Sequence, residues 1–130
     1  MPNIADYIPI VGQSIVDDLS LLAEYLKGKR IMHINSTAVG GGVAEILNRM
    51  VPLLKELGVQ THWDVIKGGE KFYDVTKKFH NALHGKADPF TEEEFNIFLE
   101  NGERNLQEMD LSSDIVFVHD PQPITLIKKR

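Results

Sequence analysis

The segment RIMHINSTAVGGGVAEILNRMVPLLKELG, residues 30–58, decides the fold that this sequence predicts. Its pattern is that of a buried strand, a turn with three consecutive glycines, and a helix that begins where the glycines end. Such a turn presents unpaired backbone N–H groups and the positive end of the helix dipole to a ligand. Because Gly40, Gly41 and Gly42 have no Cβ, a ligand can approach their backbone closely. We interpret the turn as a site for phosphate or another anion; the alternative is a tight turn without a ligand.

The glycine turn matches neither of the common nucleotide-binding motifs. A P-loop would continue with Lys and Ser or Thr, and a dinucleotide fingerprint would follow the spacing G-x-G-x-x-G with an acidic residue after the second strand. Instead, Asn35, Ser36 and Thr37 place small polar groups beside the backbone amides. This combination suits a sugar phosphate or the diphosphate of an activated sugar.

The composition is typical of one globular domain and excludes several classes of function. The chain has 130 residues, of which 42% are hydrophobic and 25% charged. A net charge of −5 argues against a nucleic-acid partner, which would need a basic face. The chain has no cysteine, which excludes disulfides and thiolate metal sites. It also has no long apolar run and no basic leader, so we expect a cytoplasmic protein without a membrane partner.

Strands and helices alternate along the chain. Strands are expected at residues 31–34, 59–66 and 115–118, and helices after Ser14, after the glycine turn, at 71–83 and at 92–107. This order is typical of an α/β fold with right-handed crossovers and a parallel sheet. The third strand is apolar throughout, which favours a central position covered on both faces. The mixed segment after Pro123 resembles the start of another helix, so we expect the 130 residues to be a piece of a longer polypeptide.

Two helices carry finer predictions. Ser14 is expected to cap the first helix, whose apolar positions at helical spacing are Ile15, Leu19, Leu22 and Leu26. In the glycine-turn helix, the buried stripe is expected to consist of Ile46, Met50, Leu53, Leu54 and Leu57. The acidic run after Thr91 is interpreted as a capping box rather than a catalytic cluster.

Ligands of parallel α/β sheets bind at the carboxyl ends of the strands. Two segments are expected to meet there, Asn35–Gly42 after the first strand and His119–Pro123 after the third. Asp120 could accept hydrogen bonds from sugar hydroxyls and His119 could donate one. The alternative for Asp120 is an Asx turn ahead of Pro121.

His80 and His84 stand four residues apart on one helix, a spacing that can hold a metal. The motif lacks a glutamate between them and a third ligand, so we predict no metal site. His80 and Asn81 are instead candidates for hydrogen bonding at the rim of the crevice, the alternative being ordinary surface residues. Trp63 is expected in the core, with sugar stacking as the alternative.

Three segments together make the sequence recognisable: HINSTAVGGGVAEIL, KKFHNALHG and VHDPQP, at residues 33–47, 77–85 and 118–123. They resemble the N-terminal part of family 4 retaining glycosyltransferases that form trehalose, and of the similar fungal-type trehalose phosphorylases. The resemblance covers nearly the whole chain but only about a third of a family member. It implies a Rossmann-like parallel sheet with flanking helices, which is part of the N-terminal domain of a GT-B enzyme. Residues 1–130 would be one truncated domain of that kind.

The resemblance also implies a function and a set of partners. The family transfers glucose from a nucleoside-diphosphate glucose to glucose, giving trehalose, without a metal or another cofactor. Gly40, Gly41 and Gly42 would lie against the donor phosphates. The substrate-binding candidates are His119, Asp120, Asn35, His80 and Asn81.

The same resemblance places the catalytic residues elsewhere. The basic pair and the glutamates of the donor site would belong to a missing C-terminal domain, so no catalytic residue is expected here and the fragment alone should be inactive. The alternatives are a non-catalytic sugar- or anion-binding module and a trehalose phosphorylase. Because an incomplete sheet can expose apolar surface, a homo-oligomer is included among the expected assemblies.

Overall fold

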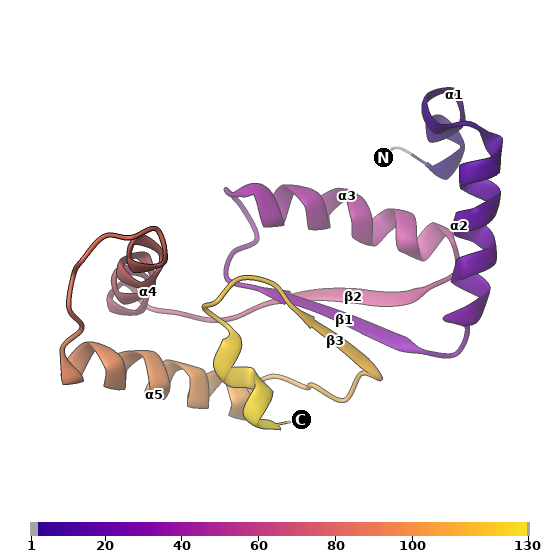
Figure 1. The fold of residues 1–130 in the computed structure, drawn as a ribbon. Helices are drawn as coiled ribbons and strands as arrows, with labels where there is room; N and C mark the ends of the chain where they lie inside the picture. Colours follow the sequence, from indigo (N-terminus) through magenta and orange to yellow (C-terminus); the bar gives the residue numbers. More distant parts are fainter. Residues whose placement is uncertain (1–2, 130) are drawn as a thin grey trace.

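The computed structural model describes residues 3–129 and has an α/β fold with a three-stranded parallel sheet between helices (Figure 1). The elements in chain order are η1 Ile4–Tyr7, α1 Ile8–Val11, α2 Gln13–Tyr25, β1 Arg30–Asn35, α3 Gly42–Glu56, β2 Gln60–Val65, α4 Glu70–Leu83, α5 Glu92–Glu108, β3 Ile115–Val118 and η2 Ile124–Lys129. Helix α3 lies on one side of the sheet, and α5 with η2 lies on the other (Figure 1). The Rossmann-like arrangement predicted from the sequence is confirmed.

The strand order is β2-β1-β3, with β1 paired in parallel to both neighbours. The predicted central position of β3 is therefore wrong, because the crossover from β2 carries the chain past β1 to its free side. Phe117 and Val118 of β3 are 48% and 41% exposed. A short run of apolar residues predicts a strand but does not say which strand lies in the middle.

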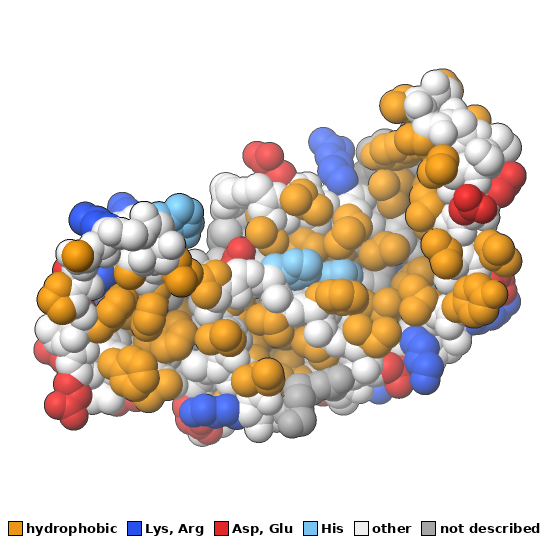
Figure 2. All heavy atoms as spheres, viewed as in Figure 1, with side chains coloured by type: hydrophobic (Ala, Val, Ile, Leu, Met, Phe, Trp, Pro, Cys, Tyr) orange, Lys and Arg blue, Asp and Glu red, His pale blue; other side chains and the backbone are white. Residues whose placement is uncertain are grey.

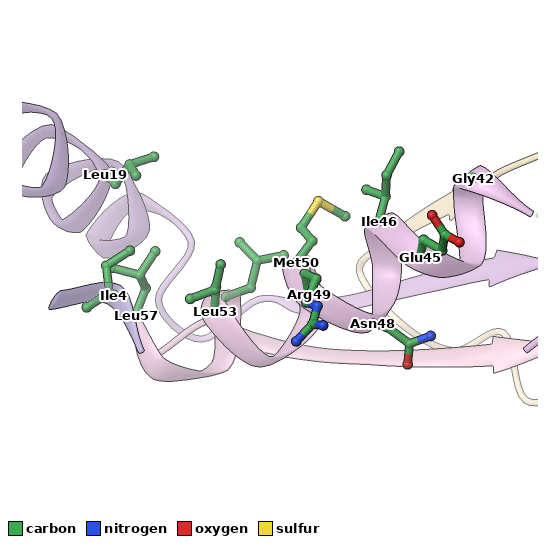
Figure 3. Close-up of a pocket in the computed structure, with 11 residues that line it drawn as sticks. Ile4, Leu19, Gly42, Glu45, Ile46, Asn48, Arg49, Met50, Leu53 and Leu57 are labelled. Atoms are coloured by element: carbon green, nitrogen blue, oxygen red, sulfur yellow. The ribbon is translucent and has the colours of Figure 1, made fainter. Parts of the chain in front are cut away.

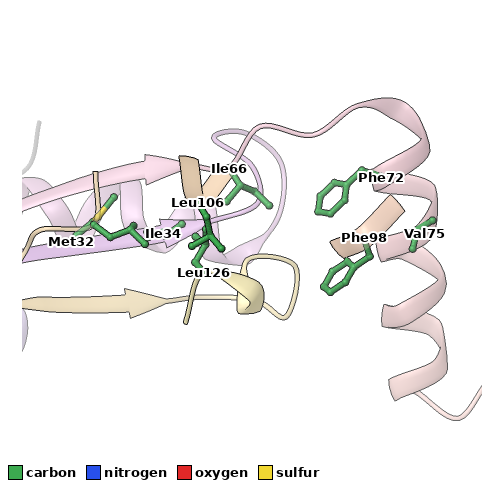
Figure 4. Packing of buried hydrophobic residues seen from close by; sticks show 9 residues of the cluster. Met32, Ile34, Ile66, Phe72, Val75, Phe98, Leu106 and Leu126 are labelled. Atoms are coloured by element: carbon green, nitrogen blue, oxygen red, sulfur yellow. The ribbon is translucent and has the colours of Figure 1, made fainter. Parts of the chain in front are cut away.

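The main core lies between the sheet and the helices α4 and α5 (Figure 4). Met32 and Ile34 of β1 are fully buried there and pack with residues such as Phe72 of α4 and Phe98 of α5. The rings of Phe72 and Phe98 stack with centroids 6.0 Å apart. Burial of apolar surface, which contributes about 25 cal/mol per Å², is the main stabilising contribution to such a fold.

Helix α2 buries a different face from the one predicted, and the prediction for α3 is right only in part. In α2, Val16 and Ala23 are buried, whereas Ile15, Leu19 and Leu22 are exposed. In α3, Ile46 is 60% exposed and Leu47 is fully buried, whereas Leu54 and Leu57 of the predicted stripe pack against a second, smaller core cluster. Both helices carry apolar residues on more than one face, so helical periodicity alone does not select the face that packs.

The helix ends were predicted with mixed success. Thr91 accepts a hydrogen bond from the backbone of Glu94, whose carboxylate accepts one from the backbone N–H of Thr91, so the capping box of α5 is confirmed. The predicted cap at Ser14 is wrong: α2 begins at Gln13 after Gly12, without a side-chain cap. The segment after Pro123 does form a helix, the short 3-10 helix η2. Within residues 3–129, no helix is long and apolar enough to span a membrane.

Candidate functional site

The two loops predicted to meet at the carboxyl edge of the sheet do lie side by side. Asp120, after β3, accepts a hydrogen bond on Oδ2 from the Ser36 hydroxyl at 3.2 Å and a long one from the Ser36 N–H at 3.5 Å. The backbone N–H of His119 donates to the carbonyl of Ile34 at 2.8 Å, which extends the β1–β3 pairing to this point. Segments 84 residues apart in sequence therefore form one wall.

Asp120 occupies a strained backbone position at this wall. Its φ is +70°, the only left-handed value at a non-glycine position among residues 3–129. Aspartate tolerates this conformation better than most residues, and such strain concentrates at functional sites. Its second carboxylate oxygen, Oδ1, makes no hydrogen bond within the described part of the chain and can accept one from a ligand.

Asn35 organises the loop after β1. It is 0% exposed; its Nδ2 donates to the carbonyl of Thr37 at 2.7 Å, and its Oδ1 accepts from the Trp63 indole at 2.8 Å. These contacts fix the direction in which the chain leaves the strand. Trp63 is half-buried and serves as a partner of Asn35. A direct contact of Asn35 with a sugar stays a prediction.

The glycine turn is open and depends on its glycines. Gly40 and Gly41 have φ of +72° and +110°, values that side chains rarely adopt, and Gly42 is the first residue of α3. No atom lies within 4 Å of a Cβ built on any of the three. Helix α3 also lacks a side-chain N-cap. The first amides of a 15-residue helix are therefore left to water or to a ligand, and the binding of an anion there stays a prediction.

A contact between two histidines, which the sequence interpretation missed, joins the half-buried His119 of this wall to the buried His33 of β1. His33 Nδ1 and His119 Nε2 are 3.0 Å apart, and His33 is only 3% exposed. The His33 ring stacks on Phe117, with centroids 5.2 Å apart and planes inclined by 10°. Burial, followed by repulsion from His119 and His62, lowers the pKa of His33. No local sequence pattern reveals this contact, because it depends on the register that pairs His33 of β1 with Phe117 of β3.

The lowered pKa of His33 predicts a pH dependence of stability. The unfolded chain binds a proton at His33 more readily than the folded protein does, so the folded state loses stability as the pH falls below the ordinary histidine range. We expect H33F to flatten this acid-side loss in urea unfolding measured across the pH range. The matched variant H62F removes an exposed histidine and should leave the slope largely in place. Equal slopes for wild type and H33F would contradict the assignment.

His80 and Asn81 lie in the last turn of α4, and the described contacts do not join them to the wall. The rings of His80 and His84 are 4.3 Å apart, and His84 Nδ1 lies 2.8 Å from the His80 carbonyl. The contact from α4 to the wall comes earlier in the helix, where the Tyr73 hydroxyl donates to the Ser36 carbonyl at 3.0 Å. Sugar contacts of His80 and Asn81 stay predictions. Among residues 3–129, no three His, Asp or Glu side chains gather in a way that could hold a metal ion.

A large groove begins at the glycine turn and runs along α3 away from the wall (Figure 3). It has a volume of about 1270 Å³ and reaches from Gly42 to Leu57, Leu19 and Ile4. Most of its lining is apolar. Its position on the helix, away from Asp120 and His119, distinguishes it from a polar sugar pocket.

Comparison with known proteins places this arrangement in a family. Residues 33–130 match the family described as the N-terminal domain of trehalose synthase. The chain belongs to this family. The trehalose synthase match covers the end of β1 from residue 33, the glycine turn and the His119-Asp120 segment, which build the wall.

Individual relatives agree with the family. The chain is 47% identical to a trehalose synthase of Pyrococcus horikoshii and 44% identical to one of Thermococcus litoralis, over 97% of its own length in both. It is also 33% identical over 143 aligned residues to a trehalose phosphorylase of Grifola frondosa. The chain spans 31% of the length of these synthases and 20% of that phosphorylase.

Proposed function

We propose that this chain is the acceptor-side, N-terminal domain of a retaining glucosyltransferase with the GT-B fold, which forms trehalose from a nucleoside-diphosphate glucose and glucose. The observation that carries the proposal is the juxtaposition of an open glycine turn and the His119-Asp120 segment at one sheet edge, in a chain of the trehalose synthase family. A sugar hydroxyl can donate a hydrogen bond to the free Asp120 oxygen, and a phosphate can accept hydrogen bonds from the first amides of α3.

The two parts of the wall serve different steps of such a reaction. Transfer with retention needs the leaving diphosphate to be stabilised, which preorganised backbone amides at Gly40–Gly42 support electrostatically. It also needs the glucose hydroxyl to be held beside the donor sugar on the face that the diphosphate leaves. Asp120 and His119 support this positioning, because the Ser36 and His33 contacts fix both residues.

The proposal assigns the chemistry to a larger protein. In it, a C-terminal domain supplies the basic residues that neutralise the diphosphate, and the 130 residues alone turn over no substrate. The relatives, which are about three times as long, support this division. The cytoplasmic location expected from the sequence stays a prediction.

The exposed hydrophobic side chains of α2, α3 and β3 support an interface with another domain or another chain. Hydrophobic side chains gather between α2, α3 and β3 and surround histidine side chains in the middle of that face (Figure 2). Ile15 and Leu22 of α2 and Ile46 of α3 are exposed apolar residues. A C-terminal domain and a second copy of the chain are the occupants that the sequence predicts, and light scattering of the isolated chain tests the second.

Product analysis tests the proposed activity. The protein that carries this chain, incubated with nucleoside-diphosphate glucose and labelled glucose, should release labelled trehalose, while the 130-residue chain alone should release none. Absence of any glucosyl transfer to glucose by the longer protein would refute the substrate assignment. The similarity to phosphorylases makes a third arm necessary. Trehalose cleavage that depends on inorganic phosphate would identify a phosphorylase instead.

A further inference from the structure

The contact between His33 and His119 limits how the two rings can be protonated. With 3.0 Å between His33 Nδ1 and His119 Nε2, one nitrogen carries a proton and donates while the other accepts. Two neutral arrangements satisfy this contact. In the first, His33 donates from Nδ1, and His119 carries its own proton on Nδ1. In the second, His119 donates from Nε2, and His33 carries its proton on Nε2.

The surroundings of His33 favour the first arrangement. His33 Nε2 is buried without a hydrogen-bond partner among residues 3–129. In the second arrangement this atom would be a buried N–H donor with no acceptor, whereas in the first it is only an unpaired lone pair. Orphaned buried N–H groups are the rarer and less favourable of the two cases. The aromatic stack of His33 with Phe117, at 5.2 Å, holds the ring in the plane that makes the contact.

We propose that His33 is a positioning residue that holds His119 in the tautomer protonated on Nδ1, so that His119 presents an N–H donor to a hydroxyl of the acceptor sugar. His119 Nδ1 makes no hydrogen bond within the described part of the chain, and His119 is half-buried and directly precedes Asp120, whose Oδ1 also makes none there. A donor and an acceptor then stand on adjacent residues, which is the pattern that a sugar hydroxyl, itself both donor and acceptor, can satisfy. The inference rests on the proposed function for the identity of the sugar.

Nitrogen NMR of the protein with isotope-labelled histidine rings tests the tautomer without any substrate. Protonated and bare ring nitrogens of a neutral imidazole resonate far apart, so the spectrum above neutral pH should show His119 protonated on Nδ1 and bare on Nε2. In H33F, which keeps a ring of similar shape but no donor, His119 should become a mixture of the two tautomers. A wild-type His119 that carries its proton on Nε2, or an H33F spectrum unchanged at His119, would overturn the proposal.

Steady-state kinetics of the longer protein test the role toward the sugar. H33F should raise KM for glucose about three- to tenfold, the range expected for one neutral hydrogen bond, and leave KM for the nucleoside-diphosphate glucose unchanged. In H33N, the amide Nδ2 stands close to the position of the imidazole Nδ1 and can donate to His119, so KM for glucose should return to within about twofold of wild type. H62F, at an exposed position on β2, should match wild type in both constants.

The outcomes separate this inference from the proposed function. Suppose that the wild-type longer protein transfers no glucose, while NMR shows the expected His119 tautomer and its loss in H33F. The substrate assignment then fails, but the role of His33 in positioning His119 is supported. If wild type is active but H33F and H33N both raise the two KM values equally, His33 is only a packing residue and the inference fails.

Discussion

Alanine at Gly41 is expected to weaken binding of nucleoside-diphosphate glucose by about 5- to 150-fold. Gly41 has φ +110° and ψ 149°, a region that is essentially restricted to glycine, and forcing a side chain there costs about 1–3 kcal/mol. In the free protein the turn can relax and avoid the strain. Binding to the backbone amides needs the original conformation, so the strain appears as lost affinity. Calorimetric titration of the longer protein with nucleoside-diphosphate glucose, in wild-type form and as G41A, measures the loss of affinity.

Gly42 offers a matched control in the same turn. Its φ is outside the left-handed region, it begins α3, and a Cβ built on it meets no atom within 4 Å. G42A should therefore bind the donor nearly as wild type does and gain slight helix stability, because alanine is the better helix former. If G41A and G42A bind equally well, the turn does not hold the diphosphate and the donor-side part of the proposal is wrong.

The sequence predicted the two loops that form the wall, but it did not predict the buried residue that contacts one of them. Apolar strands, glycines and turn residues are local signals, and they place Asn35–Gly42 and His119–Pro123 at one edge without three-dimensional information. The contact of Ser36 with Asp120 confirms that placement. The buried partner of His119 was not predictable in the same way, because His33 lies inside an apolar strand and its role depends on which strand is its neighbour.

The order of the strands was the main missing fact. Alternation of strands and helices fixes a parallel sheet, but the run Ile115–Val118 is compatible with a centre or an edge position. Placing β3 next to β1 brings Phe117 and His119 against His33, which creates the histidine pair. The exposed apolar faces of α2 and α3 have a similar origin, since periodicity cannot say which apolar face the rest of a protein covers.

Replacing Asn105 with leucine is expected to lower the free energy of unfolding by about 2–4 kcal/mol. Asn105 of α5 is 2% exposed and holds the backbone of Lys67, between β2 and α4. Its Oδ1 accepts from the Lys67 N–H and its Nδ2 donates to the Lys67 carbonyl, both at 2.8 Å. N105L removes both bonds, leaves the Lys67 N–H without a partner, and also loses the donation to the Asn101 carbonyl at 2.8 Å. Urea unfolding gives the change.

Two further substitutions, N101A and K67A, show whether the Asn105 hydrogen bonds to the Lys67 backbone cause the loss of stability in N105L. N101A removes a single 3.0 Å donation to the Lys67 carbonyl, which Asn105 still satisfies, so it should cost only about 1 kcal/mol. K67A keeps the backbone and removes only the exposed ion pair with Glu108, so it should leave stability within experimental error. If N105L and K67A lower the free energy of unfolding equally, the hydrogen bonds of Asn105 to the Lys67 backbone are not the cause. Because the segment held by Asn105 leads into α4, whose Tyr73 contacts Ser36, N105L should also weaken sugar binding at the wall before the protein unfolds.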